Sequence, residues 1–322
     1  MQTIRRLGYT ALVLGFAQVV FGAIVRITGS GMGCGDNWPD CFGTFAPAHN
    51  APTLLVEISH RYGAAALSIA IVVLAATAWR KRGERGIRGG GGVLRPSLLA
   101  VMLVIVAALF GAITVKMQLH PAVVVTHLAI AMSLLAVLVV VVVRAGGFGS
   151  ATVFATSGRT RRSAAAAASL TFLALVLGAL TANTAGAALA CQGFPWCRSM
   201  PLHGAPLAIQ VSHRVIAFLL FGHLIGVAVG VRRRREAAPV RVAAWAALGI
   251  VVVQIVVAAG MVEMHLPSSL RSLHQSIGTA LWIAVTTLAA LASAPAGASD
   301  LERIVYESPS RGEFATPEGV ST

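Results

Sequence analysis

Four histidines and one glutamate are the side chains in this sequence whose types and spacing could support chemistry. The segment E-I-S-H-R at residues 57–61 places Glu57 three residues before His60, so both lie on nearly the same face of a helix. The segment Q-V-S-H-R at 210–214 repeats the pattern 153 residues later, with an amide in place of the carboxylate. The repeat indicates two related sites with different chemistry.

Each of the four histidines follows a proline that can begin a helix. The histidines His60, His127, His213 and His274 come six to eight residues after Pro52, Pro121, Pro206 and Pro267, respectively. At 1.5 Å per residue, every imidazole would lie about 10 Å inside the same end of its helix. Two imidazoles at equal depth can ligate one iron from opposite sides, so His60 with His127, and His213 with His274, are interpreted as two haem-ligand pairs.

Other uses of these side chains stay open. A single histidine in an apolar helix often bonds to a backbone carbonyl, but four at matched positions favour ligation. Zinc or copper also binds imidazole, although two per site leave the coordination shell incomplete. Arg61 and Arg214 each follow a histidine, where a guanidinium suits haem propionates; the alternative is that they extend to lipid headgroups.

The exchange of Glu57 for Gln210 separates the two halves chemically. A binding site needs no carboxylate, whereas moving a proton or stabilising a cation at a reacting centre does. We therefore predict that the first half reacts, with Glu57 catalytic, and that the second half holds a fixed cofactor. The alternative is a structural Glu57, protonated and hydrogen-bonded to a neighbour.

The elements that position these residues are predicted to cross a membrane. The 322 residues are 57% hydrophobic and 11% charged, whereas a soluble domain has about a quarter charged residues. The sequence predicts an all-α integral membrane fold with eight spans. They cover residues 8–26, 54–79, 97–116, 121–143, 164–182, 207–231, 242–261 and 270–291.

The internal repeat predicts how these spans are grouped. Four spans per repeat give both halves the same direction through the membrane. We expect two tandem four-helix bundles related by a pseudo-twofold axis along the membrane normal. The bundles would occupy residues 1–145 and 146–292, and the polar segment 293–322 is expected to be a disordered cytoplasmic tail.

Loop charge predicts orientation and accounts for the net charge of +14. Seventeen Lys and Arg residues fall in loops on one side, and only Arg26, Lys116, Arg198 and Arg271 fall on the other. Both termini are therefore expected in the cytoplasm, in a protein of the cell membrane surrounded by lipid. The basic runs lie between apolar stretches and form no stripe interleaved with aromatics, so no nucleic-acid partner is expected.

All four cysteines fall in loops predicted to be extracytoplasmic. Cys34 and Cys41 share the first outer loop, and Cys191 and Cys197 share the third. Two close pairs on an oxidising face favour disulfides Cys34–Cys41 and Cys191–Cys197. Zinc is the alternative, but each loop offers two thiolates where zinc takes four ligands.

Together these motifs resemble the bacterial haem A synthase family, CtaA. The resemblance extends over roughly residues 8–291. It rests on the two H-R motifs above, on T-H-L at 126–128, on L-H-Q at 273–275 and on the paired cysteines. The resemblance implies oxidation of the C8 methyl of haem O to a formyl group, through two successive hydroxylations, for haem A and cytochrome oxidase assembly.

The resemblance also implies how the residues divide. A cofactor haem b would bind His213 and His274, and substrate haem O would lie near His60, His127 and Glu57. The alternative function is a two-haem b-type membrane electron carrier, although all four histidines lie toward one face. The sequence is compatible with a complex with the farnesyltransferase that makes haem O, and with a homo-oligomer. It contains no interface motif for either. The sequence does not indicate the electron acceptor.

Overall fold

Eight long helices make up most of the structure, a computed structural model that describes residues 1–44, 51–150 and 155–293. Their bounds are α1 (Gln2–Ile27), α2 (Pro52–Arg80), α3 (Leu94–Lys116), α4 (Pro121–Arg144), α5 (Gly158–Asn183), α6 (Ala205–Arg233), α7 (Ala238–Glu263) and α8 (Ser268–Ala292). Each is long and apolar enough to cross a membrane. The predicted all-α class with eight spans is confirmed, and the chain is a multi-pass membrane protein.

Several helices begin before the predicted spans, in arginine-rich turns. α1 begins at Gln2 rather than at residue 8, and α5 begins at Gly158 rather than at 164. A long arginine side chain can reach the headgroups while its backbone stays helical, so the helix need not end where the apolar run ends. Prolines stand in the first turn of α2, α4 and α6, as expected, because no N–H is required there.

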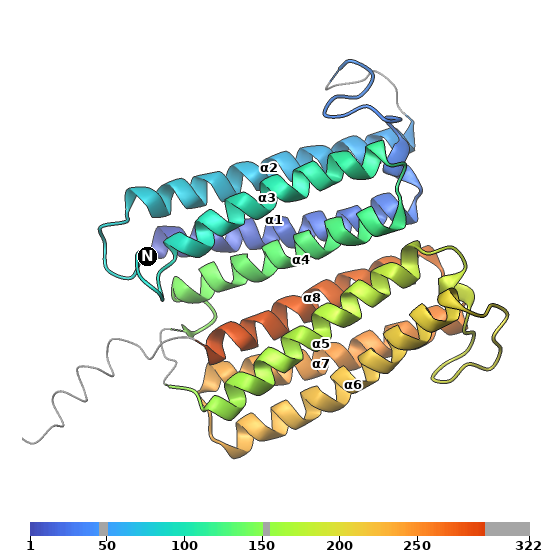
Figure 1. Ribbon diagram of the computed structural model, residues 1–322. Helices are drawn as coiled ribbons and strands as arrows, with labels where there is room; N and C mark the ends of the chain where they lie inside the picture. The colour runs from blue at the N-terminus through green and yellow to red at the C-terminus, as the bar shows by residue number, and fades with distance from the viewer. Residues whose placement is uncertain (45–50, 151–154, 294–322) are drawn as a thin grey trace, which may run out of the picture.

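The helices pack as two groups of four (Figure 1). In the first group, α1 and α3 each contact both α2 and α4; in the second, α5 and α7 each contact both α6 and α8. The groups meet where α8 contacts α1 and α4, and where α4 contacts α5. Such rings are the arrangement of four-helix bundles, so the groups are called the first and second bundle below. The pseudo-twofold axis between them stays a prediction.

Among the described residues, the interface between the bundles is apolar with one buried polar contact. The indole of Trp282 in α8 donates to the carbonyl of Met132 in α4 at 2.7 Å, and its ring lies 5.6 Å from that of Phe172 in α5. On the outer surface, Ile69 and Val256 are 65% and 64% exposed. Large apolar side chains so exposed suit a surface that faces lipid.

The two ends of the helices differ in what their connections carry. Figure 1 shows the cysteine-containing loops at one end, and the N-terminus and the α2–α3 and α6–α7 connections at the other. At the latter end, buried Glu236 accepts hydrogen bonds from the hydroxyls of Ser157 at 2.7 Å and Thr160 at 2.6 Å. These bonds fasten the start of α5 to the α6–α7 connection. Apart from Ser293, the tail expected to be disordered lies outside the described residues.

Candidate functional site

The four predicted histidines lie in two pairs, one pair in each bundle. His60 in α2 lies near His127 in α4, and His213 in α6 lies near His274 in α8. Nδ1 of His127 and Nδ1 of His274 are buried without a hydrogen-bond partner among the described residues. An unpaired polar atom in an apolar interior is costly. The pairs therefore suit a ligand that adds polar or metal contacts from outside the chain.

The donor set of each pair fits a haem. Axial ligands of iron stand on opposite faces of the porphyrin, and each pair comes from helices at opposite corners of its bundle. Across residues 1–44, 51–150 and 155–293, no group of three or more His, Cys, Asp or Glu side chains could hold a metal. Two imidazoles per bundle are therefore the ligand set that the described chain offers.

Two glycines that the sequence interpretation missed make room for the imidazoles. A Cβ on Gly22 of α1 would lie 3.1 Å from Cε1 of His60, and a Cβ on Gly178 of α5 would lie 2.9 Å from Cε1 of His213. Both separations are tighter than ordinary van der Waals contact. The two glycines are 156 residues apart, the same offset as Cys41 and Cys197. This shared repeat offset is the sequence feature that could have identified the two glycines.

Three of the histidines also bond to the helix that precedes them in the chain. The side-chain amide of Gln18 lies 3.0 Å from Nδ1 of His60, and the amide of Gln254 lies 3.3 Å from Nε2 of His274. His213 has a backbone partner instead, because its Nδ1 lies 2.9 Å from the carbonyl of Ala174. Neither glutamine was identified from the sequence.

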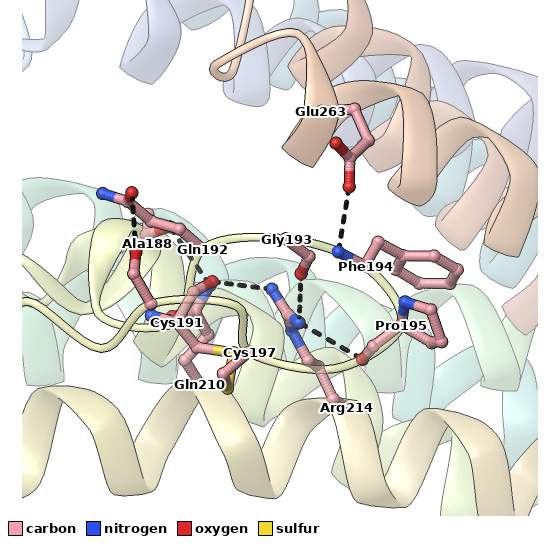
Figure 2. Close-up of a disulfide and its surroundings, with 11 residues drawn as sticks. Ala188, Cys191, Gln192, Gly193, Phe194, Pro195, Cys197, Gln210, Arg214 and Glu263 are labelled. Atoms are coloured by element: carbon pink, nitrogen blue, oxygen red, sulfur yellow. Dashed lines mark hydrogen bonds between the residues drawn. A yellow bond between two sulfur atoms is a disulfide. The ribbon is translucent and has the colours of Figure 1, made fainter.

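The second disulfide loop is held by the residues of the Q-x-x-H-R motif, as Figure 2 shows. Cys191 and Cys197 form a disulfide with their Cα atoms 5.0 Å apart. The side-chain carbonyl of Gln210 accepts from the Cys191 N–H, while its amide donates to the Cys191 carbonyl at 3.2 Å. Arg214 donates to the carbonyls of Cys191 at 2.8 Å and Gly193 at 2.7 Å. The motif therefore fastens the loop over the end of α6.

The first loop is held in the same way, but by a charged pair. Cys34 and Cys41 form the other disulfide. Buried Glu57, 3% exposed, accepts from the Cys34 N–H at 2.9 Å and from the guanidinium of Arg61. Arg61 also donates to the carbonyls of Asp40 at 2.7 Å and Asn37 at 2.9 Å. Glu57 and Gln210 thus occupy matching positions and accept from matching amides, and they differ in charge.

These contacts bear on the expected roles of the motif residues. Both oxygens of Glu57 accept hydrogen bonds, so the carboxylate anchors a loop in addition to any catalytic role. Among the described residues, the guanidinium N–H groups of Arg61 donate to loop carbonyls and to Glu57. Those of Arg214 donate to loop carbonyls. The contact of either arginine with a haem propionate stays a prediction.

A second charge difference lies beside the loops. Glu263, at the end of α7, accepts from the Phe194 N–H at 2.9 Å (Figure 2). It also accepts from the guanidinium of Arg198. The matching position in the first half is Lys116, at the end of α3, which lies 3.8 Å from a carboxylate oxygen of Asp36. The signs of the two ion pairs are exchanged between the halves. The two disulfide loops therefore present different charges at the same end of the protein.

Fold and site together define a class: a multi-pass all-α membrane protein with a histidine pair in each bundle and a disulfide loop above each pair. Comparison with known families then identifies the chain. The cytochrome oxidase assembly protein family, COX15-CtaA, matches residues 5–286. The chain belongs to this family.

Individual relatives carry a more specific name. The chain is 33% identical over 215 residues to the heme A synthase of Lysinibacillus sphaericus strain C3-41, a match that covers 62% of this chain and 66% of that protein. It is 29% identical over 236 residues to the heme A synthase of Geobacillus kaustophilus strain HTA426, covering 70% and 71%. The matches thus span about two thirds of the length of these relatives.

Proposed function

We propose that this protein is a haem A synthase, which oxidises the C8 methyl of haem O to the formyl group of haem A. Membership of the COX15-CtaA family and relatives named heme A synthase support this activity. The structural observation that carries it is the exchange of Glu57 for Gln210 at matching loop contacts. An electron carrier would need no such difference between its two haem sites.

The reaction needs two oxidations at one carbon. Each hydroxylation replaces a C–H bond with a C–O bond to an oxygen from water, and it releases two electrons and two protons. The second hydroxylation gives a geminal diol, which loses one water to leave the formyl group. The four electrons that the two steps release pass to an external electron acceptor.

The first bundle is the proposed site of this chemistry. Haem O would lie between His60 and His127, with its reacting edge toward the disulfide loop and Glu57. Arg61 and the Cys34 N–H donate to the two carboxylate oxygens of Glu57, so the carboxyl group is held beside the first disulfide loop. An ionised carboxylate next to the reacting carbon can accept the released proton or stabilise positive charge at that carbon.

The second bundle is the proposed cofactor site. His213 and His274 would hold haem b, which supplies electron transfer when bound. Gln210 cannot exchange a proton at neutral pH, so this bundle lacks the catalytic group of the first. Ala174 and Gln254 hold the two imidazoles in place through their contacts with the rings.

Loop charge supports a cell-membrane location with both termini in the cytoplasm and the disulfide loops outside. The arginine-rich connections lie at the end opposite to the disulfide loops. Haem O is too apolar to travel through water, so entry from the lipid between the helices suits this location. The haem O-forming farnesyltransferase is the partner that this route favours.

Expression of the chain in cells that make haem O but no haem A tests the proposal. Extracted haems, separated by chromatography, should contain haem A only when the chain is present. Haem O as the sole product in cells with well-expressed, membrane-inserted protein would contradict the proposed activity and favour the electron carrier.

A further inference from the structure

Two arginines, Arg26 and Arg271, lie near each other where the two bundles meet. Arg26 is in the last turn of α1, and Arg271 lies near the start of α8, a helix that contacts α1. Both side chains are half-buried, at the end of the helices that carries the disulfide loops (Figure 1). Among the described residues, no ion pair includes either arginine. Like charges repel, so the pair suits a ligand that brings negative charge.

Arg271 lies one helical turn from a proposed haem ligand. It precedes His274 by three residues on α8, so the two side chains lie on nearly the same face. Nδ1 of His274 is buried without a hydrogen-bond partner among the described residues, which points independently to a ligand on this face. A cation near the start of a helix also faces the positive end of the helix dipole. The position of Arg271 is therefore unfavourable unless an anion binds beside it.

Arg26 belongs to the first bundle but reaches the second. Its guanidinium donates to the carbonyl of Ala182 in α5 at 3.4 Å. Ala182 follows Gly178 by four residues, so it lies on the same face of α5, one turn nearer the disulfide loops. A Cβ on Gly178 would lie 2.9 Å from Cε1 of His213. Arg26 and Arg271 therefore lie one turn beyond the two histidines of the second bundle, one arginine beyond each histidine.

The first bundle has no such pair at the matching positions. At the repeat offsets, Arg26 corresponds to Ala182, and Arg271 corresponds to Val124. Neither alanine nor valine can bind an anion through its side chain. The two arginines are therefore a feature of the second bundle, to which the first bundle contributes one side chain.

The propionate groups of a haem match these two cations in number and in charge. A haem carries both propionates on one edge of its ring, and arginine binds a carboxylate through two parallel hydrogen bonds. Arg214 was the arginine expected at the propionates of this bundle, but its guanidinium donates to carbonyls of the second disulfide loop. Arg26 and Arg271 have no such loop contacts among the described residues.

We propose that Arg26 and Arg271 bind the propionates of the haem that His213 and His274 hold. One of the contacts that retain the cofactor would then come from the first bundle, across the interface. This inference rests on the proposed function, because that function assigns haem b to the second bundle. The substrate haem has no matching pair of arginines, in keeping with its release as product in each cycle.

Binding of haem b and of its dimethyl ester tests the proposal, because the ester keeps the iron and the ring but has no propionate charge. Full-length protein with His60→Ala/His127→Ala, the parent protein of the test, leaves the second pair as the binding site. Titration of the haem-free protein, followed by absorbance, gives the two dissociation constants. We expect the ester to bind at least about tenfold more weakly than haem b, the scale for hydrogen bonds between charged groups.

Removal of either arginine should abolish part of that preference. Arg26→Gln and Arg271→Gln, each added to the parent protein, should weaken haem b binding by about tenfold and leave ester binding unchanged. Lys116→Gln is the matched control, because it removes a positive charge from the same end of the first bundle, and it should alter neither constant. Arginine variants that keep the full preference for haem b over the ester would overturn the proposal. If neither variant folds, equal binding of haem b and ester by the parent protein would overturn it.

A phospholipid phosphate is the other anion that suits two arginines at this place. In that case the wild-type protein would retain phosphatidylglycerol, detected by mass spectrometry, and Arg26→Gln would lose the lipid without a change in haem b affinity. That result would overturn the proposal.

The failure of the proposed function would look different. Wild-type protein that makes no haem A contradicts the synthase, whatever the preference for haem b over its ester. Wild-type protein that makes haem A, with haem b affinities that the two arginine variants do not alter, contradicts the propionate contacts alone.

Discussion

The Cys34 backbone N–H donates to Oε2 of Glu57 at 2.9 Å, so the carboxylate proposed to be catalytic is fastened to the first disulfide loop. Cys34 is itself joined to Cys41. The position of the carboxylate therefore depends on an intact loop, and the loop depends on the disulfide. Gln210 and Cys191 repeat the relationship in the second bundle, without a charge.

Removal of the first disulfide should lower haem A yield more than it lowers stability. The variant Cys34→Ser/Cys41→Ser opens a short loop, which should reduce the free energy of unfolding by about 2 kcal/mol. It also frees the N–H that positions Glu57, so haem A should fall severalfold in extracted haems. The control Cys191→Ser/Cys197→Ser should cost similar stability and act mainly on haem b content. Wild-type haem A yield in the first variant would show that the loop does not position Glu57.

Gly178→Ala should weaken haem b binding by displacing an imidazole. The added Cβ would lie 2.9 Å from Cε1 of His213, so the ring must shift away from its place. We expect a lower haem b content in the purified protein and an altered visible spectrum. Gly226→Ala on α6 is the matched control, because a Cβ there meets nothing within 4 Å. Equal haem content in both variants would contradict the assignment of His213.

His213→Ala and His274→Ala should each remove the low-spin haem b signal from the purified protein. Loss of one axial imidazole leaves the iron with a single protein ligand, so its spin state changes even where some haem remains. The measurement is electron paramagnetic resonance together with haem content. Wild-type spectra in both single variants would rule out the second bundle as the haem b site.

Orientation can be checked with reporters fused to the chain ends and loops. A reporter after Thr322, or in the arginine-rich connection between α6 and α7, should be active only in the cytoplasm. A reporter in the loop between α5 and α6 should be active only outside. The reverse pattern would also place the disulfide loops in a reducing compartment.

The spans, the histidine pairs and the disulfides could be predicted because each has a strong local signal. About 20 apolar residues are needed to cross a bilayer, and the sequence contains eight such runs. The internal repeat then showed that His60 corresponds to His213 and that His127 corresponds to His274. Because the chain contains a repeat, the interpretation of a residue in one half can be compared with the residue at the matching position in the other half.

The contacts of the motif residues could not be predicted, because they depend on how an irregular loop folds back over a helix. Nothing in the local sequence indicates that Arg61 would bond to loop carbonyls, or that Glu57 would accept from the Cys34 amide. Gln18 was missed for a different reason. No neighbouring residue in the sequence marks it, and its contact with His60 depends on the fold, because Gly63 on another helix makes room for its side chain.

The variant Glu57→Gln tests the central claim most directly, because it makes the first bundle imitate the second. A glutamine keeps the volume and can accept from the Cys34 N–H, as Gln210 does from Cys191, while the charge is lost. A purely structural Glu57 should tolerate this at about the cost of one hydrogen bond, ~1 kcal/mol. The reciprocal variant Gln210→Glu loses the amide that donates to the Cys191 carbonyl, so it should lower haem b content and leave the contacts of Glu57 unchanged.

The measurement is haem extraction and chromatography from cells that express each variant beside the wild type. We predict that Glu57→Gln protein folds, keeps its haem b and still binds haem O, yet forms little haem A, with haem O or its hydroxymethyl form in its place. Wild-type amounts of haem A from the Glu57→Gln variant would contradict the catalytic role of Glu57 and the placement of the reaction in the first bundle.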